Sequence, residues 1–147
     1  MYFVDRDKME TTLVYLEKQI NLFTAQPEWS TPLEKAALER ITQMSLEAIF
    51  DVGNAMIDGF IMRDPGSYDD IIEILMDEKV ISQETGNDLK SLIPYRKQLV
   101  QDYTEIVHSE LKEQFANSHP ALSLFAKNVR DYLTNELGPV SAFKSQE

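Results

Sequence analysis

The chain is 147 residues long, a length typical of one domain with its own hydrophobic core. It has 14 Lys and Arg against 25 Asp and Glu, and the resulting net charge of −11 disfavours RNA and anionic membranes as partners. The absence of cysteine excludes disulfides, thiolate catalysis and cysteine-based zinc sites, and only two histidines are present. We therefore expect neither a metal nor a cofactor.

The sequence shows no segment suited to membrane insertion or export. No apolar stretch is long enough to span a bilayer, and the charged amino-terminal segment does not resemble a signal peptide. We therefore expect a cytoplasmic protein.

Apolar residues repeat at helical spacing along the chain, which predicts an all-α protein. The first helix is expected from about Asp7 to Ala25. Thr31 then combines with Pro32 and Glu34 as an N-cap, a first-turn proline and a capping-box glutamate. This motif predicts the start of a long helix that continues to about Phe60.

The second half of the chain is predicted to hold two short and two longer helices. Ser67 and Ser82 are expected N-caps of the short helices, and Pro94 should interrupt or kink the second one. Helical spacing resumes over 95–117, and Pro120 begins a last helix.

These elements predict a single domain over residues 1–147. Its expected architecture is an antiparallel four-helix up-and-down bundle with one or two additional short helices. Gly138 and the proline after it should end the last helix, so the tail is expected to fray from about residue 138.

The long helix predicted after Thr31 has two apolar faces, although a helix in a monomeric bundle needs only one. The second face is a stripe formed by Leu46, Phe50, Gly53, Ile57 and Phe60. An exposed apolar stripe indicates an interaction surface, so we predict a homodimer interface here, with the glycine permitting close helix approach. The alternative is that the shorter helices cover this stripe within one chain.

Polar residues lie between these two faces at positions 47, 51, 54 and 58 (Glu47, Asp51, Asn54 and Asp58). Inward carboxylates on a bundle occur in di-iron proteins, but those sites need a Glu-x-x-His motif that neither histidine provides. We therefore predict a solvated or salt-bridged row, with Arg40 nearby. A second acidic row, formed by Asp69, Glu73 and Asp77, is expected to face solvent.

Arg96 falls within the apolar arc of the helix predicted over 95–117, and Tyr103 lies two turns further along the same side. An arginine directed toward a core is unusual unless it is paired or lines a cleft. The alternative, which periodicity alone favours, is that Arg96 extends to solvent at the end of the bundle.

Residues 95–103, Tyr95-Arg96-Lys97-Gln98-Leu99-Val100-Gln101-Asp102-Tyr103, resemble the signature of the HepT-like family in the HEPN superfamily. That signature is Arg, four to six residues, His, any residue, then Tyr. Residues 64–68 and 51–54 also match, and the resemblance covers nearly the whole chain. It is closest to a subgroup found in Gram-positive bacteria.

The resemblance implies an all-α homodimeric toxin that acts as a metal-independent endoribonuclease. It also implies a small MntA-type nucleotidyltransferase antitoxin, which would silence the toxin by transferring AMP to Tyr103. The motif arginine and histidine of the family line a cleft between subunits. Arginine binds phosphate bidentately, and histidine suits proton transfer because it titrates near neutrality.

This sequence departs from the family at Gln101, which stands at the histidine position. A carboxamide cannot exchange protons near pH 7, and loss of a general base typically costs about 10²–10⁴-fold in rate. His108 would lie roughly 10 Å further along a continuous helix, too far to substitute. On that helix Gln101 would also point about 140° away from Arg96, so either the helix is distorted or two subunits contribute.

We therefore predict Arg96, Gln101 and Tyr103 as the catalytic positions of a poor ribonuclease, with Tyr103 as a possible site of AMPylation. One alternative is a catalytically silent binding partner or substrate-binding subunit of a small nucleotidyltransferase. Another is a structural adaptor that binds a helix through its apolar stripe.

Overall fold

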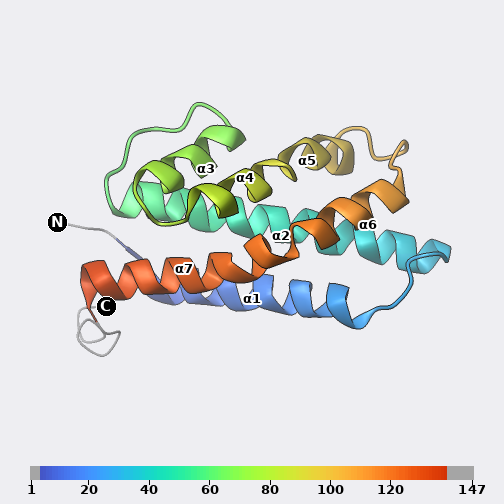
Figure 1. The fold of residues 1–147 in the computed structure, drawn as a ribbon, viewed down its shortest axis with the longest axis horizontal. Coiled ribbons are helices and arrows are strands. Elements are labelled where there is room, and N and C mark those ends of the chain that lie inside the picture. Colours follow the sequence, from blue (N-terminus) through green and yellow to red (C-terminus); the bar gives the residue numbers. More distant parts are fainter. Residues whose placement is uncertain (1–3, 139–147) are drawn as a thin grey trace.

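The computed structural model describes residues 4–138, which fold into helices and connecting turns without a strand (Figure 1). The prediction of an all-α protein is confirmed. The tail expected to fray from about residue 138 lies almost entirely outside the described residues. In chain order the helices are α1 (Arg6–Ala25), α2 (Pro32–Gly59), α3 (Tyr68–Asp77), α4 (Gln83–Lys90), α5 (Ile93–Val100), α6 (His108–Asn117) and α7 (His119–Leu137).

The polar residues predicted to begin helices do so. The Glu34 backbone N–H donates to the Thr31 hydroxyl, and the Thr31 N–H donates to the Glu34 carboxylate, which completes the capping box of α2. The hydroxyls of Ser67 and Ser82 each accept a backbone N–H three residues further along. Each cap supplies a partner to an N–H group that the helix itself leaves unbonded.

Helix α2 lies at the centre of the molecule and contacts α1, α3, α5 and α6. Figure 1 shows α1 and α2 side by side and antiparallel, α4 and α5 returning along α2, and α6 followed by α7 running back. Helix α7 packs on α1, where Arg130 binds the carboxylates of Glu10 and Glu17 at N–O distances of 2.7 and 2.8 Å. The order is therefore up and down, but the last two passes are divided into shorter helices.

The continuous helix predicted over 95–117 is wrong. Residues 101–107 form a loop between α5 and α6. The Lys97 carbonyl accepts the backbone N–H groups of both Gln101 and Asp102, at 2.8 and 3.2 Å, and this arrangement closes the last turn of α5.

Apolar spacing across this loop does not correspond to a buried face. Val100 is 39% exposed, Tyr103 62% and Val107 49%. Their periodicity suggested a helix, but no neighbouring element covers them.

The second apolar face of α2 is buried within the chain, so the predicted homodimer interface at this stripe is also wrong. All five of its residues, Leu46, Phe50, Gly53, Ile57 and Phe60, are buried. A side chain that is already packed inside one protomer cannot also pack against a second copy.

Short helices and α7 supply this cover. The Phe50 ring packs on Tyr68 at the start of α3, with ring centroids 4.6 Å apart, and Phe60 packs edge-on against Tyr132 of α7 at 5.1 Å. Gly53 does permit close helix approach, but the helix that approaches is α3 of the same chain: a Cβ at this position would lie 2.6 Å from Cγ2 of Ile71.

No helix within residues 4–138 is long and apolar enough to cross a membrane.

We expect Phe50→Asp to destabilise the protomer itself. The change removes a buried ring, which alone costs about 3–5 kcal/mol, and leaves an unpaired carboxylate among apolar groups. Denaturant unfolding followed by circular dichroism measures the loss. Leu33→Asp, at a position 82% exposed, is the control and should change the free energy of unfolding by less than about 0.5 kcal/mol. If the wild type is a dimer and Phe50→Asp converts it to a folded monomer, the stripe is a dimer interface after all.

Candidate functional site

Two glutamates on the polar side of α2 bind side chains from other helices, Arg96 of α5 and His108 of α6. Glu47 Oε1 accepts a hydrogen bond from Nε of Arg96 at 2.8 Å, and Glu39 Oε2 lies 2.8 Å from Nε2 of His108. The two glutamates are eight positions apart on one helix, or about 12 Å along its axis. The salt-bridged row predicted here is confirmed at Glu47, but its partner is Arg96 and not the nearby Arg40.

Arg96 is fixed between α2 and α3. Besides the bond to Glu47, its guanidinium lies over the ring of Tyr68, with Cζ 4.2 Å from the ring centroid. The side chain is 21% exposed. Neither Nη nitrogen hydrogen-bonds to another group within residues 4–138, so both are available to an anion. Of the two alternatives that the sequence left open, the structure shows a paired arginine and not one that extends to solvent at the end of the bundle.

Gln101 and Tyr103 lie beyond the end of α5. Gln101 is the exposed C-cap residue, and Tyr103 lies in the loop with its side chain in solvent. The expected common helix face of Arg96 and Tyr103 is therefore wrong, because the helix ends before Tyr103. The loop instead presents the phenol hydroxyl where another protein can reach it.

His108 is the residue that sequence reasoning set aside. On a continuous helix His108 would be too far from Arg96 to take part, but in the structure it begins α6 after a loop and is bound to α2. Glu39 lies eight residues, or two steps of four, before Glu47 on the same side of the helix. Extending the polar row back to Glu39 could have indicated a partner for His108. Tyr68 was noted only as part of a matching segment, and its contact with Arg96 depends on tertiary packing.

The other acidic residues do not assemble a metal site. Within the described part of the chain, no group of three or more His, Asp or Glu side chains could hold a metal ion. Asp51, Asn54 and Asp58 are exposed, as expected for a solvated row. In the second acidic row Glu73 differs from expectation, since it is half-buried and bound by Lys90 of α4.

The chain was compared with protein families and with known proteins. The family model for Ribonuclease HepT-like proteins matches residues 12–129. The "Putative RNase YutE" of Bacillus subtilis (strain 168) is 54% identical over 144 residues, which are 98% of this chain and 100% of that protein.

Solved structures agree with this result. The structure of Bacillus subtilis YutE, described as a cytosolic protein of unknown function, superposes with a TM-score of 0.94 at 53% identity and covers 97% of this chain and 100% of that one. A tri-AMPylated Shewanella oneidensis HEPN toxin in complex with an MNT antitoxin shares the fold, with a TM-score of 0.71 at 17% identity over 84% of this chain and 95% of that one. The chain belongs to the Ribonuclease HepT-like family, which confirms the resemblance seen in residues 95–103.

We expect Glu47→Ala to lower the free energy of unfolding by about 1–3 kcal/mol, because it removes the acceptor of a largely buried guanidinium. Adding Arg96→Met should recover part of this loss, since a methionine needs no acceptor. Denaturation of both single variants, the double variant and the wild type gives the coupling energy. Asp51→Ala, an exposed carboxylate one turn further on, is the matched control. A coupling energy near zero would show that Glu47 does not hold Arg96.

Proposed function

We propose that this protein is a toxin–antitoxin component and a weak, metal-independent endoribonuclease in which Arg96 binds the scissile phosphate. The state of Arg96 carries the proposal: its Nε and one face are occupied by Glu47 and Tyr68, while both Nη nitrogens remain free. A guanidinium fixed in this way loses little side-chain entropy when it binds phosphate. Membership in the family supports the assignment of ribonuclease chemistry.

Proton transfer limits the expected rate. In a metal-free cleavage the ribose 2′-oxygen bonds to phosphorus, the bond to the 5′-oxygen breaks, and the 2′-hydroxyl proton must pass to an acceptor. The Gln101 carboxamide cannot accept it near neutrality. Arg96 can still stabilise charge on the phosphate oxygens, although its pairing with Glu47 offsets part of its positive charge. The combination gives slow cleavage.

The second candidate function is a catalytically silent partner or substrate-binding subunit of a nucleotidyltransferase. Gln101 and the net charge of −11 favour this alternative, because the first removes the proton acceptor and the second repels RNA.

We propose Tyr103 as the AMP acceptor for an MntA-type nucleotidyltransferase antitoxin. Its phenol oxygen would bond to the α-phosphorus of ATP, and pyrophosphate would leave. The exposure of Tyr103 supports this role, as does the AMPylated state of the Shewanella oneidensis toxin with the same fold. The added phosphate would repel RNA from the neighbouring helix α5.

We also propose that the protein is a homodimer and lies in the cytoplasm. The homodimer that the family resemblance implies would need an interface outside the buried stripe on α2. A cytoplasmic location is supported by the Bacillus subtilis relative, which is described as cytosolic.

In EDTA, the wild type should cleave a labelled single-stranded RNA slowly, and Gln101→His should raise the rate by about 10- to 1000-fold because imidazole accepts the proton. Arg96→Ala in the Gln101→His background should remove this gain. Arg40→Ala, at an exposed arginine of α2, is the matched control and should keep it. Strong wild-type cleavage that survives Arg96→Ala would place the active site elsewhere. If neither the wild type nor the Gln101→His variant cleaves RNA, the catalytically silent partner is favoured.

Incubation with ATP, magnesium and a cognate MNT-type transferase should add AMP to Tyr103, as shown by intact mass and peptide mapping. Tyr103→Phe should abolish the adduct because it removes the acceptor oxygen. Tyr15→Phe, at a tyrosine of α1 that is 37% exposed, controls for accessible phenols in general. AMP found only at another residue would remove this role from Tyr103.

A further inference from the structure

A cavity of about 740 Å³ opens where the linker between α1 and α2 meets the start of α6. Its volume falls within the range of small-ligand sites, about 300–1,000 Å³. Neither Arg96 nor Tyr103 lines it, so the proposed ribonuclease site leaves it unused. The lining comes from the linker around Trp29, from Lys35 of α2, and from the end of the 101–107 loop with the first residues of α6 up to Lys112.

Two lysines line this cavity from different helices, Lys35 from α2 and Lys112 from α6. Lys35 and Lys112 form no ion pair within residues 4–138, whereas the side chains of Lys90, Arg96 and Arg130 are each bound by a carboxylate. Lys18, Arg40 and Lys79 also form no ion pair within the described residues, so the distinctive feature of Lys35 and Lys112 is that both line one concave site. An anion bound in this cavity would be attracted by both ammonium groups.

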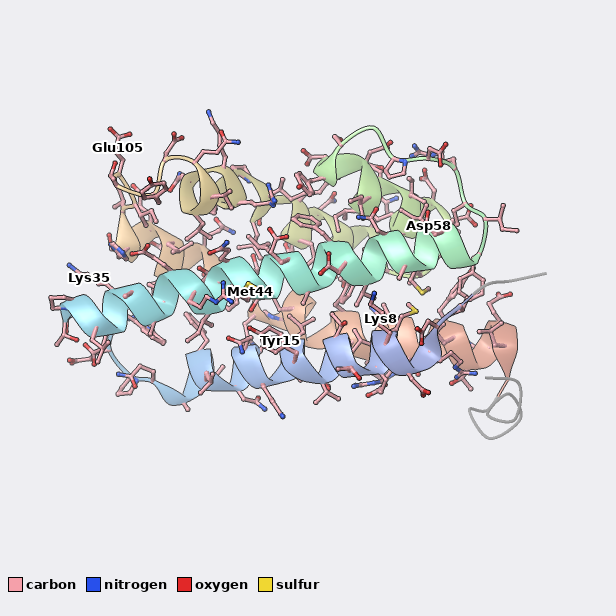
Figure 2. All side chains as sticks on the ribbon, turned by 180° about the vertical axis from the view of Figure 1, so that it is seen from behind. Lys8, Tyr15, Lys35, Met44, Asp58 and Glu105 are labelled. Carbon is pink, nitrogen blue, oxygen red and sulfur yellow. The ribbon has the colours of Figure 1, made fainter. Side chains whose placement is uncertain are left out.

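The acidic groups at this end leave the cations accessible. Glu28 is the one carboxylate among the lining residues, and its side chain is exposed. Figure 2 shows Lys35 near the beginning of α2 and Glu105 projecting outward from the loop before α6. Glu28, Glu105 and Glu110, the last in the first turn of α6, are exposed, so water screens them. The half-buried carboxylate of Glu39 is bound to His108.

The start of α6 adds further donors. Glu39 accepts a hydrogen bond from Nε2 of His108, which leaves Nδ1 of the neutral imidazole as an acceptor, so the donors at this end are the backbone N–H groups. Val107, the N-cap residue of this ten-residue helix, provides no side-chain cap for its first N–H groups. Free N–H groups and the positive end of the helix dipole favour an anion beside the lysines.

An apolar wall stands next to the cations. Trp29 is 8% exposed and stacks on Phe23 with ring centroids 5.8 Å apart, so its position is fixed. Ile106 is half-buried and Val107 is exposed, and both line the cavity. Positive groups beside an apolar wall match a ligand that carries both a phosphate and a flat, largely apolar base.

We propose that this cavity is a second binding site, which takes the phosphate group of a nucleotide unit, either in an RNA strand or free. Lys35, Lys112 and the start of α6 donate to the phosphate oxygens, and the base or ribose lies against the apolar wall. The site goes beyond the proposed ribonuclease function and does not depend on it. An RNA strand that also reached Arg96 would pass along the 101–107 loop, which joins the two sites.

Trp29 makes the site directly observable because it is the one tryptophan of the chain. Its indole ¹H–¹⁵N resonance is followed while the protein is titrated with pyrophosphate, AMP, and a short RNA with or without a 5′-phosphate. Calorimetry on the same samples gives the dissociation constants. We expect saturable binding with a shift of the indole resonance, weakened by added salt.

Lys35→Gln combined with Lys112→Gln should weaken binding by at least about tenfold, because two charge-assisted contacts are lost. Lys18→Gln combined with Lys79→Gln is the matched control, since it changes the net charge equally at two exposed lysines away from the cavity. It should leave the dissociation constant within about twofold. Circular dichroism confirms that both pairs remain folded.

The possible results separate the ligand sources and the two sites. Tighter binding of RNA than of AMP identifies a strand, and the reverse identifies a free nucleotide. Absence of saturable binding at about 10 mM ligand, or equal weakening by both lysine pairs, would overturn the proposal. Arg96→Ala should leave the shift of the Trp29 indole resonance by AMP unchanged, because Trp29 lines the cavity and Arg96 does not. Failure of the ribonuclease proposal and failure of this one are therefore seen independently.

Discussion

Helix α2 carries apolar side chains on two sides, and both sides must be shielded from water. One chain achieves this by packing α1 against one side and α3, α5 and part of α7 against the other. Each fully buried aliphatic or aromatic side chain contributes about 1.5–3 kcal/mol, so leaving either side exposed would remove much of the stability of a domain of this size. The position of α2 at the centre of the bundle follows from this requirement.

The polar row is the part of α2 that remains between its two covered sides. Carboxylates placed there lose part of their hydration, because α5 and α6 pack alongside, and they therefore need hydrogen-bond donors as partners. Arg96 and His108 meet this need for Glu47 and Glu39. Such partly buried pairs contribute little net stability, but they fix the geometry of the groups they join. The core of the protein thus determines where the side chains of the candidate site can lie.

Features set by a few neighbouring residues could be predicted from the sequence. The caps at Thr31, Ser67 and Ser82 act over three residues, and the signature around Arg96 is contiguous. The break after α5 could not be predicted, because Val100, Tyr103 and Val107 have helical spacing although nothing covers them. The stripe containing Phe50 was recognised as apolar, but periodicity does not distinguish cover by the same chain from cover by a second copy.

Contacts between residues distant in the sequence were also beyond reach. The bond between Glu47 and Arg96 joins positions 49 residues apart, and that between Glu39 and His108 joins positions 69 apart. Each depends on how α5 and α6 pack on α2 once the loop has turned the chain. The motif singled out Arg96 as a candidate site residue, whereas its contacts with Glu47 and Tyr68 became visible only in three dimensions.

The absence of a side chain at Gly53 allows α3 to pack closely on α2, and this packing places Tyr68 against Arg96. A single methyl group there would press on Ile71, whose branched side chain has one strongly preferred rotamer in a helix, and α3 would have to move as a unit. Tyr68 lies one turn earlier on α3 and would carry the ring away from the Arg96 guanidinium. Residue 53 would then score as essential in an activity screen although it never meets a ligand. Residues that affect the site therefore include some that act only through the packing of helices on one another.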